Sequence, residues 1–146
     1  MHELRSALVR LTVGQQPTEE LPDLAARALA EGIDAPALRE LTGLSRADVR
    51  EARDLFLLAM EQLGADVPVS RWDAVRFWAA EIVNGALTPY EGARLIWFHG
   101  YLELDCPDEL TPFVGLASEW EDDPAHRALY EQDILNEARQ LIGQSA

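Results

Sequence analysis

Helix-start signals and glycine stops alternate along this chain of 146 residues, and no window alternates apolar and polar residues over the length of a strand. Ser70 precedes Asp73 by three residues, and Thr88-Pro89 is followed by Glu91, both patterns that open helices. Glycines follow three of the apolar-periodic runs, at Gly32, Gly64 and Gly85. The sequence therefore predicts an all-α protein with seven to eight helices and no sheet.

One of the predicted helices differs from the others in its polarity. The helices are expected at about 2–13, 22–31, 35–42, 45–63, 70–84, 89–104, 107–120 and 123–143. Within ARLIWFHGYLEL, residues 93–104, the only polar side chains are Arg94, His99 and Glu103. A helix that is apolar nearly all round is typical of the buried centre of a bundle. We therefore expect a compact bundle around a central apolar helix at about 89–104.

The length is that of one helical domain with a sizeable core, spanning residues 1–146. The segment 65–69 follows a glycine stop and contains Pro68, so it is a candidate hinge between two lobes, 1–64 and 70–146. Aromatic residues are unevenly distributed, since Phe56 alone precedes residue 70. One domain, with two lobes as the alternative, is the expected organisation.

Composition excludes several classes of function. The 12 basic residues are all Arg, so lysine Schiff-base chemistry and a phosphate-binding P-loop are excluded. Against 26 acidic residues they leave a net charge of −14, which would repel the phosphates of nucleic acid. The single cysteine, Cys106, cannot form an intramolecular disulfide, and no apolar run approaches the ~18 residues of a membrane span. We expect a cytoplasmic protein that binds neither nucleic acid nor membrane.

Residues 37–55 carry a weak helix-turn-helix pattern around Gly43. Three arginines of its second helix would point outward, namely Arg46, Arg50 and Arg53. Three acidic residues interleave with them at the spacing of intrahelical ion pairs, namely Asp48, Glu51 and Asp54. Two helices joined by a tight glycine turn is the preferred interpretation, and DNA binding is the last of the alternatives.

Acidic residues gather in the C-terminal third of the chain. Residues 102–137 contain eleven acidic residues and one arginine, Arg127, which is −10 of the net charge of −14. A surface of this kind can hold a basic partner protein, with Trp120 as an aromatic anchor. The residues predicted to bind such a partner are Glu103, Asp105, Asp108, Glu109, Glu119, Trp120, Glu121, Asp122 and Asp123. The alternative is a solvated face, with Trp120 in the core at the end of its helix.

A second hypothesis concerns aromatic residues around one imidazole. Clustered aromatic side chains line many small-molecule sites, including those of enzymes. The candidate pocket residues are Trp78, Trp97, His99, Tyr101 and Trp120. The simpler interpretation is that these residues are part of the core.

The sequence contains no recognisable catalytic or metal-binding motif. It lacks G-x-S-x-G, a glycine-rich phosphate loop, HExxH and the EF-hand pattern, and its three histidines are scattered. The thiol of Cys106 lies among Asp105, Asp108 and Glu109, whose charges oppose its ionisation. We therefore expect no catalytic residue, metal or cofactor, and a non-enzymatic role is favoured over an enzymatic one.

Three segments carry a resemblance to other proteins: 31–64, WAAEIVNGALTPYEGARLIW (78–97) and PFVGLASEWEDDP (112–124). They resemble uncharacterised small acidic helical proteins of high-GC actinobacteria, and this resemblance implies a helical fold. In size, charge and helicity the chain is also similar in general character to immunity proteins that neutralise basic toxins. This likeness implies an inhibitor that binds a basic protein through its acidic face.

Overall fold

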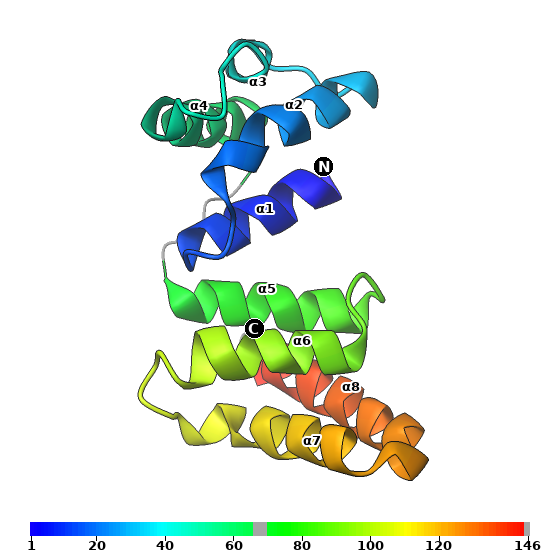
Figure 1. The fold of residues 1–146 in the computed structure, drawn as a ribbon. Helices are drawn as coiled ribbons and strands as arrows, with labels where there is room; N and C mark the ends of the chain where they lie inside the picture. The colour runs from blue at the N-terminus through cyan, green and yellow to red at the C-terminus, as the bar shows by residue number, and fades with distance from the viewer. Residues whose placement is uncertain (66–69, 145–146) are drawn as a thin grey trace. The chain divides into compact units, whose positions relative to one another are not determined.

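The computed structural model describes residues 1–65 and 70–144, and every regular element in them is helical. This part of the chain contains eight α-helices, labelled in Figure 1, which confirms the predicted all-α class and helix number. The chain divides into two compact units, Met1–Val69 and Ser70–Ala146. Residues 66–69 of the candidate hinge lie outside the described residues.

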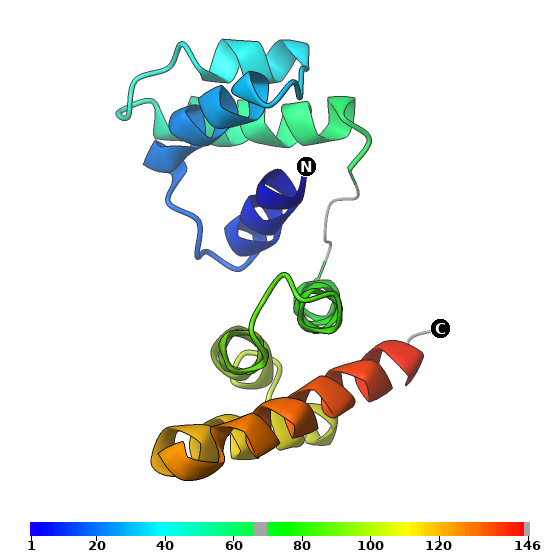
Figure 2. The ribbon, with the colours of Figure 1, turned by 90° about the vertical axis from the view of Figure 1, so that its right-hand side faces the viewer.

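The N-terminal unit contains four α-helices. They are α1 (His2–Thr12), α2 (Leu21–Ala30), α3 (Pro36–Leu41) and α4 (Val49–Gln62), with a one-turn 3₁₀ helix at Thr18–Glu20. Leu8, Leu38 and Phe56 are fully buried in one apolar core to which all four α-helices contribute. Figure 2 shows α2, α3 and α4 close together, and α3 contacts both α2 and α4. The unit is therefore held by apolar burial between helices, as amphipathic helices require.

The connection between α3 and α4 differs from the expected tight glycine turn. It spans residues 42–48, longer than the three or four residues of a DNA-binding helix-turn-helix. Asp48 Oδ2 accepts hydrogen bonds from the Ser45 backbone N–H (3.0 Å) and hydroxyl (3.1 Å). The predicted Ser45–Asp48 contact thus forms, but it closes a turn ahead of the helix, and α4 begins only at Val49.

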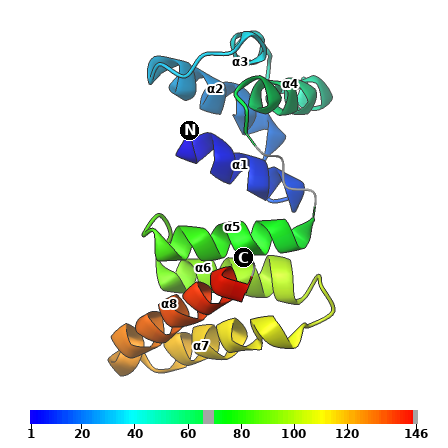
Figure 3. The same cartoon turned by 180° about the vertical axis from the view of Figure 1, so that it is seen from behind.

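The C-terminal unit contains the other four α-helices. They are α5 (Arg71–Val83), α6 (Pro89–Ile96), α7 (Thr111–Asp122) and α8 (Arg127–Gln144). Figure 3 shows α8 running diagonally across α7 and α6 toward α5, and α8 contacts all three. Trp78, Ile96, Phe113 and Ile134 are buried, so each of the four helices contributes a large apolar side chain to the core. This unit carries all of the residues predicted to bind a partner.

The predicted central segment, 89–104, is central within this unit but is not a single buried α-helix. Its first part, α6, contacts α5, α7 and α8, and it continues as a π-helical turn at Trp97–Tyr101. Phe98 and Leu102 are 39% and 49% exposed, although both are apolar. Four residues apart, they share one side of the helical turn, and this side faces solvent.

Local signals place most helix ends correctly. The Ser70 hydroxyl accepts from the Asp73 backbone N–H (3.2 Å), and the Thr88 hydroxyl accepts from that of Glu91 (3.3 Å), as both capping boxes predict. The last two helices are each preceded by a 3₁₀ turn, Asp108–Leu110 and Pro124–His126. They therefore begin about four residues later than the sequence predicts, at Thr111 and Arg127.

Candidate partner-binding surface

The predicted acidic residues lie in two groups at opposite ends of α7. Glu103, Asp105, Asp108 and Glu109 are exposed in the connection that leads into this helix. The second group, 119–123, forms its last turn and the residue that ends it. A helix of 12 residues spans about 18 Å, so the two groups do not form one continuous patch on α7.

The second group is partly engaged within the protein itself. The Tyr90 hydroxyl donates a hydrogen bond to Glu121 Oε1. Asp123 Oδ2 accepts from the Tyr130 hydroxyl (2.7 Å) and lies 2.8 Å from His126 Nδ1. The bond from Tyr130 and then that from His126 lower the pKa of Asp123, and the Asp123 carboxylate raises the pKa of Tyr130 to about 12. Glu121 and Asp123 therefore join α7 to its neighbours and are less available to a partner.

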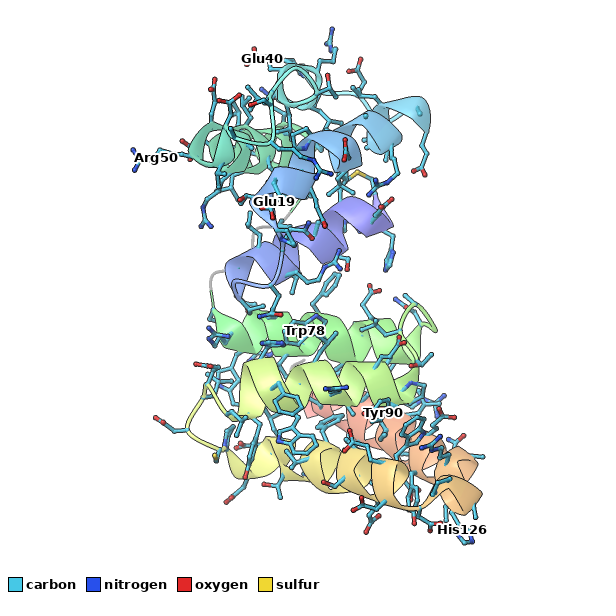
Figure 4. All side chains as sticks on the ribbon, in the orientation of Figure 1. Glu19, Glu40, Arg50, Trp78, Tyr90 and His126 are labelled. Atoms are coloured by element: carbon cyan, nitrogen blue, oxygen red, sulfur yellow. The ribbon has the colours of Figure 1, made fainter. Side chains whose placement is uncertain are left out.

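Trp120, the predicted anchor, is held in a stack. Its ring lies on that of Tyr90, with centroids 3.8 Å apart and 13° between the planes. The Arg127 guanidinium lies 3.8 Å from the Trp120 ring centroid, and Arg127 Nε donates to the Trp120 carbonyl (3.0 Å). Figure 4 labels Tyr90 and also His126, at the corner between α7 and α8. Trp120 is half-buried and packed between α6 and α8, so its role in this structure is to join helices.

Two residues of the first group, Asp108 and Glu109, line a cleft. A space of about 200 Å³ lies between the start of α7 and the C-terminal half of α8. It is lined by Asp108, Glu109, Pro112, Glu137, Gln140 and Leu141. Three of these side chains are carboxylates and none is basic. In the described structure the side chains of Asp108, Glu109 and Glu137 form no ion pair or hydrogen bond with the rest of the protein.

The sequence reasoning missed Glu137 and Gln140 as site residues. Glu137 lies on α8 between Ile134, Ala138 and Leu141, which are all buried. A residue at this spacing borders the buried side of its helix and so faces a neighbouring element. That signal places Glu137 beside some neighbour, but it does not identify the neighbour as the segment that contains Asp108.

The residues of the alternative aromatic pocket are not gathered around one space. Trp78 is buried on α5, and its ring centroid lies 6.3 Å from that of His99. Trp97 and Tyr101, half-buried, belong to the same π-helical turn as His99. Trp120 instead stacks on Tyr90, in the first turn of α6, whereas this π-helical turn follows the last turn of α6. Four of the five residues are thus neighbours, and Trp120 is separate from them.

Burial lowers the pKa of His99 below its ordinary value. The charge of Arg71 lowers this pKa further, and that of Glu103 acts in the opposite direction. Arg71 Nη1 also donates to the His99 backbone carbonyl (3.0 Å). At neutral pH His99 is therefore an uncharged ring beside Trp78, which fits a role in packing.

Metal and membrane sites are not evident in the part of the chain that the structure describes. Among residues 1–65 and 70–144, no three His, Cys, Asp or Glu side chains are grouped so as to hold a metal ion. None of the helices described is both long and apolar enough to cross a membrane.

No protein-family model, curated protein or solved structure matches the chain significantly. The function is therefore inferred from the charges and geometry of the residues themselves.

Proposed function

We propose that this protein is a non-enzymatic binding module, similar in role to an immunity or inhibitor protein, whose acidic C-terminal unit binds a basic partner protein. The observation that supports this proposal is the cleft lined by Asp108, Glu109 and Glu137. These carboxylates come from two segments, and no side chain of the described protein neutralises them. The cleft is a place where a partner's cationic side chain gains several charge-assisted hydrogen bonds.

Arginine is the side chain that suits this cleft best. Its planar guanidinium presents five N–H donors and binds carboxylates in a bidentate geometry. The amide of Gln140 adds an acceptor, and Pro112 and Leu141 provide apolar surface for the methylene groups of the side chain. A partner's arginine is therefore expected to extend into the cleft between α7 and α8.

Further exposed acidic residues lie at the two ends of α7, outside the cleft. Glu103 and Asp105 precede the cleft residue Asp108 in the sequence, and both are exposed. Glu119 and Asp122 are exposed at the far end of α7. Charges at the rim of an interface mainly raise the association rate and make it sensitive to salt. The net charge of −14 also attracts a basic partner and so raises the association rate. A cytoplasmic location is part of this proposal.

The test compares two variants that lose the same three charges. The cleft variant is Asp108→Asn, Glu109→Gln and Glu137→Gln, in which each new side chain has nearly the shape of the old one. The control variant is Glu19→Gln, Glu40→Gln and Glu51→Gln, all exposed in the N-terminal unit. Tagged wild type and both variants are used to capture proteins from the host's lysate at low and at high salt.

The proposal expects wild type and the control to retain a basic protein at low salt and to lose it at high salt, and the cleft variant to lose it at both. Titration of wild type with N-acetyl-arginine-N-methylamide should also shift the backbone amide resonances of Asp108, Glu109 and Glu137. Equal capture by the cleft variant and the wild type, or loss of capture by both variants alike, would show that the cleft is not the binding site.

A further inference from the structure

The N-terminal unit contains a polar pocket that shares no residue with the acidic surface of the C-terminal unit. A space of about 280 Å³ lies between the side chains of α1, the connection that follows it, and α2. Two arginines and two glutamates line it, Arg10, Arg27, Glu3 and Glu20, together with Gln16. Four of its seven lining residues are therefore charged, two of each sign.

The charges in this pocket are only partly paired. Arg27 donates from Nε (3.2 Å) and Nη2 (2.9 Å) to Glu3 Oε1. In the described structure Arg10 and Glu20 form no ion pair or side-chain hydrogen bond. One cation and one anion of the pocket are therefore left without a protein partner.

Arg10 has a further unusual feature. Its Nε is buried and has no hydrogen-bond partner. A buried donor without an acceptor costs about 1–3 kcal/mol, and more when the group is charged. A guanidinium does not lose its proton at any physiological pH, so this donor needs an acceptor, and the described protein provides none.

The geometry points to a small ligand that carries both a carboxylate and an ammonium group, so we propose that this pocket binds a free α-amino acid. The carboxylate accepts from the Arg10 guanidinium, which matches it in shape, and the ammonium group donates to Glu20. The two arginines and two glutamates balance in charge, which suits a zwitterion. A phosphate dianion would instead add two uncompensated negative charges to this balanced pocket and would leave Glu20 without a cation.

This inference is independent of the proposed function because the two sites lie in different units. Its test uses the full chain and four probes, namely glycine, acetate, methylammonium and inorganic phosphate. The readout is the Nε–H resonance of Arg10 in a ¹H–¹⁵N spectrum as each probe is added at millimolar concentration. Glycine should shift this resonance saturably and acetate more weakly, whereas methylammonium and phosphate should leave it unchanged.

Variants assign the binding to the named groups. Arg10→Met should abolish glycine binding, and Arg10→Lys, which keeps the charge but loses the planar fork, should weaken it at least tenfold. Glu20→Gln should weaken glycine binding but not acetate binding. The matched control is Arg5→Met, since Arg5 is exposed on the same helix and does not line the pocket. Backbone amide spectra follow binding in the Arg10 variants and verify that they fold.

Three outcomes would overturn the inference. The absence of any saturable shift with glycine or acetate would mean that water alone occupies the pocket. Binding of phosphate as strong as that of glycine would exclude selection of a zwitterion. An equal loss in the Arg5 and Arg10 variants would attribute the effect to net charge rather than to the pocket.

Discussion

At the scale of single residues, His99 shows how a polar side chain is accommodated beside a core. Its ring lies near buried Trp78, and burial together with the Arg71 charge lowers its pKa from the ordinary value. In the unfolded chain the imidazole regains an ordinary pKa near 6.5. Between these two pKa values the unfolded state binds more protons than the folded state, so acidification favours unfolding.

The expected consequence is a pH-dependent loss of stability. The contribution of His99 to the free energy of unfolding is fully present above about pH 6.5 and is lost as the pH falls toward and through the lowered pKa of His99. Urea unfolding between pH 5 and pH 8 should show this decline, and His99→Gln should make it shallower. An NMR titration in which His99 protonates at or above its ordinary pKa would contradict the expectation.

At the scale of elements, α5 packs tightly along α6 because α6 and its π-helical extension have glycines at the contact. A Cβ at Gly92 would lie 2.3 Å from Ile82 Cγ1, and one at Gly100 would lie 2.5 Å from Val75 Cγ2. Both distances are far below van der Waals contact, so neither position admits a side chain without movement of its neighbour. The two glycines therefore set the distance between these helices.

Gly92→Ala is expected to destabilise the C-terminal unit by about 1–3 kcal/mol, the usual cost of overpacking a core. Gly115→Ala is the control, because Gly115 lies within α7, is exposed, and a Cβ there would meet no atom within 4 Å. Alanine at that position should stabilise the protein by about 0.5–1 kcal/mol. Chemical denaturation of the two variants gives both values, and equal effects would mean that packing at Gly92 is unimportant.

At the scale of the whole molecule, each unit has its own apolar core. The buried residues of the first unit, such as Leu38 and Phe56, form one cluster without residues from the second. All four tryptophans and all three tyrosines lie after residue 70. Aromatic fluorescence therefore reports on the C-terminal unit, whereas far-ultraviolet circular dichroism reports on the helices of both.

Two separate cores predict two separate unfolding transitions. Urea unfolding followed by tryptophan fluorescence should give a single transition, and circular dichroism should show an additional change at a different urea concentration. Coincident curves from the two probes, with equal midpoints and slopes, would show instead that the units unfold together.

The sequence by itself determined the helical class, the helix number and most helix ends, because these depend on interactions within a few residues. Ser70 and Thr88 cap their own helices, and Gly64 and Gly85 follow theirs with positive φ angles of 75° and 84°. The sequence alone also predicted an acidic surface, and seven of the eight carboxylates named for it are exposed. These features depend on residues that are close together in the sequence.

Only the tertiary structure decided which carboxylates line one cleft. Glu137 lines the same cleft as Asp108 and Glu109 because α8 packs on α7, and no local sequence pattern predicts that packing. The same holds for Trp120, whose stack depends on Tyr90 of α6 and Arg127 of α8, and for the unpaired Arg10. Such sites form from side chains far apart in the chain, so their geometry depends on the packing of whole helices.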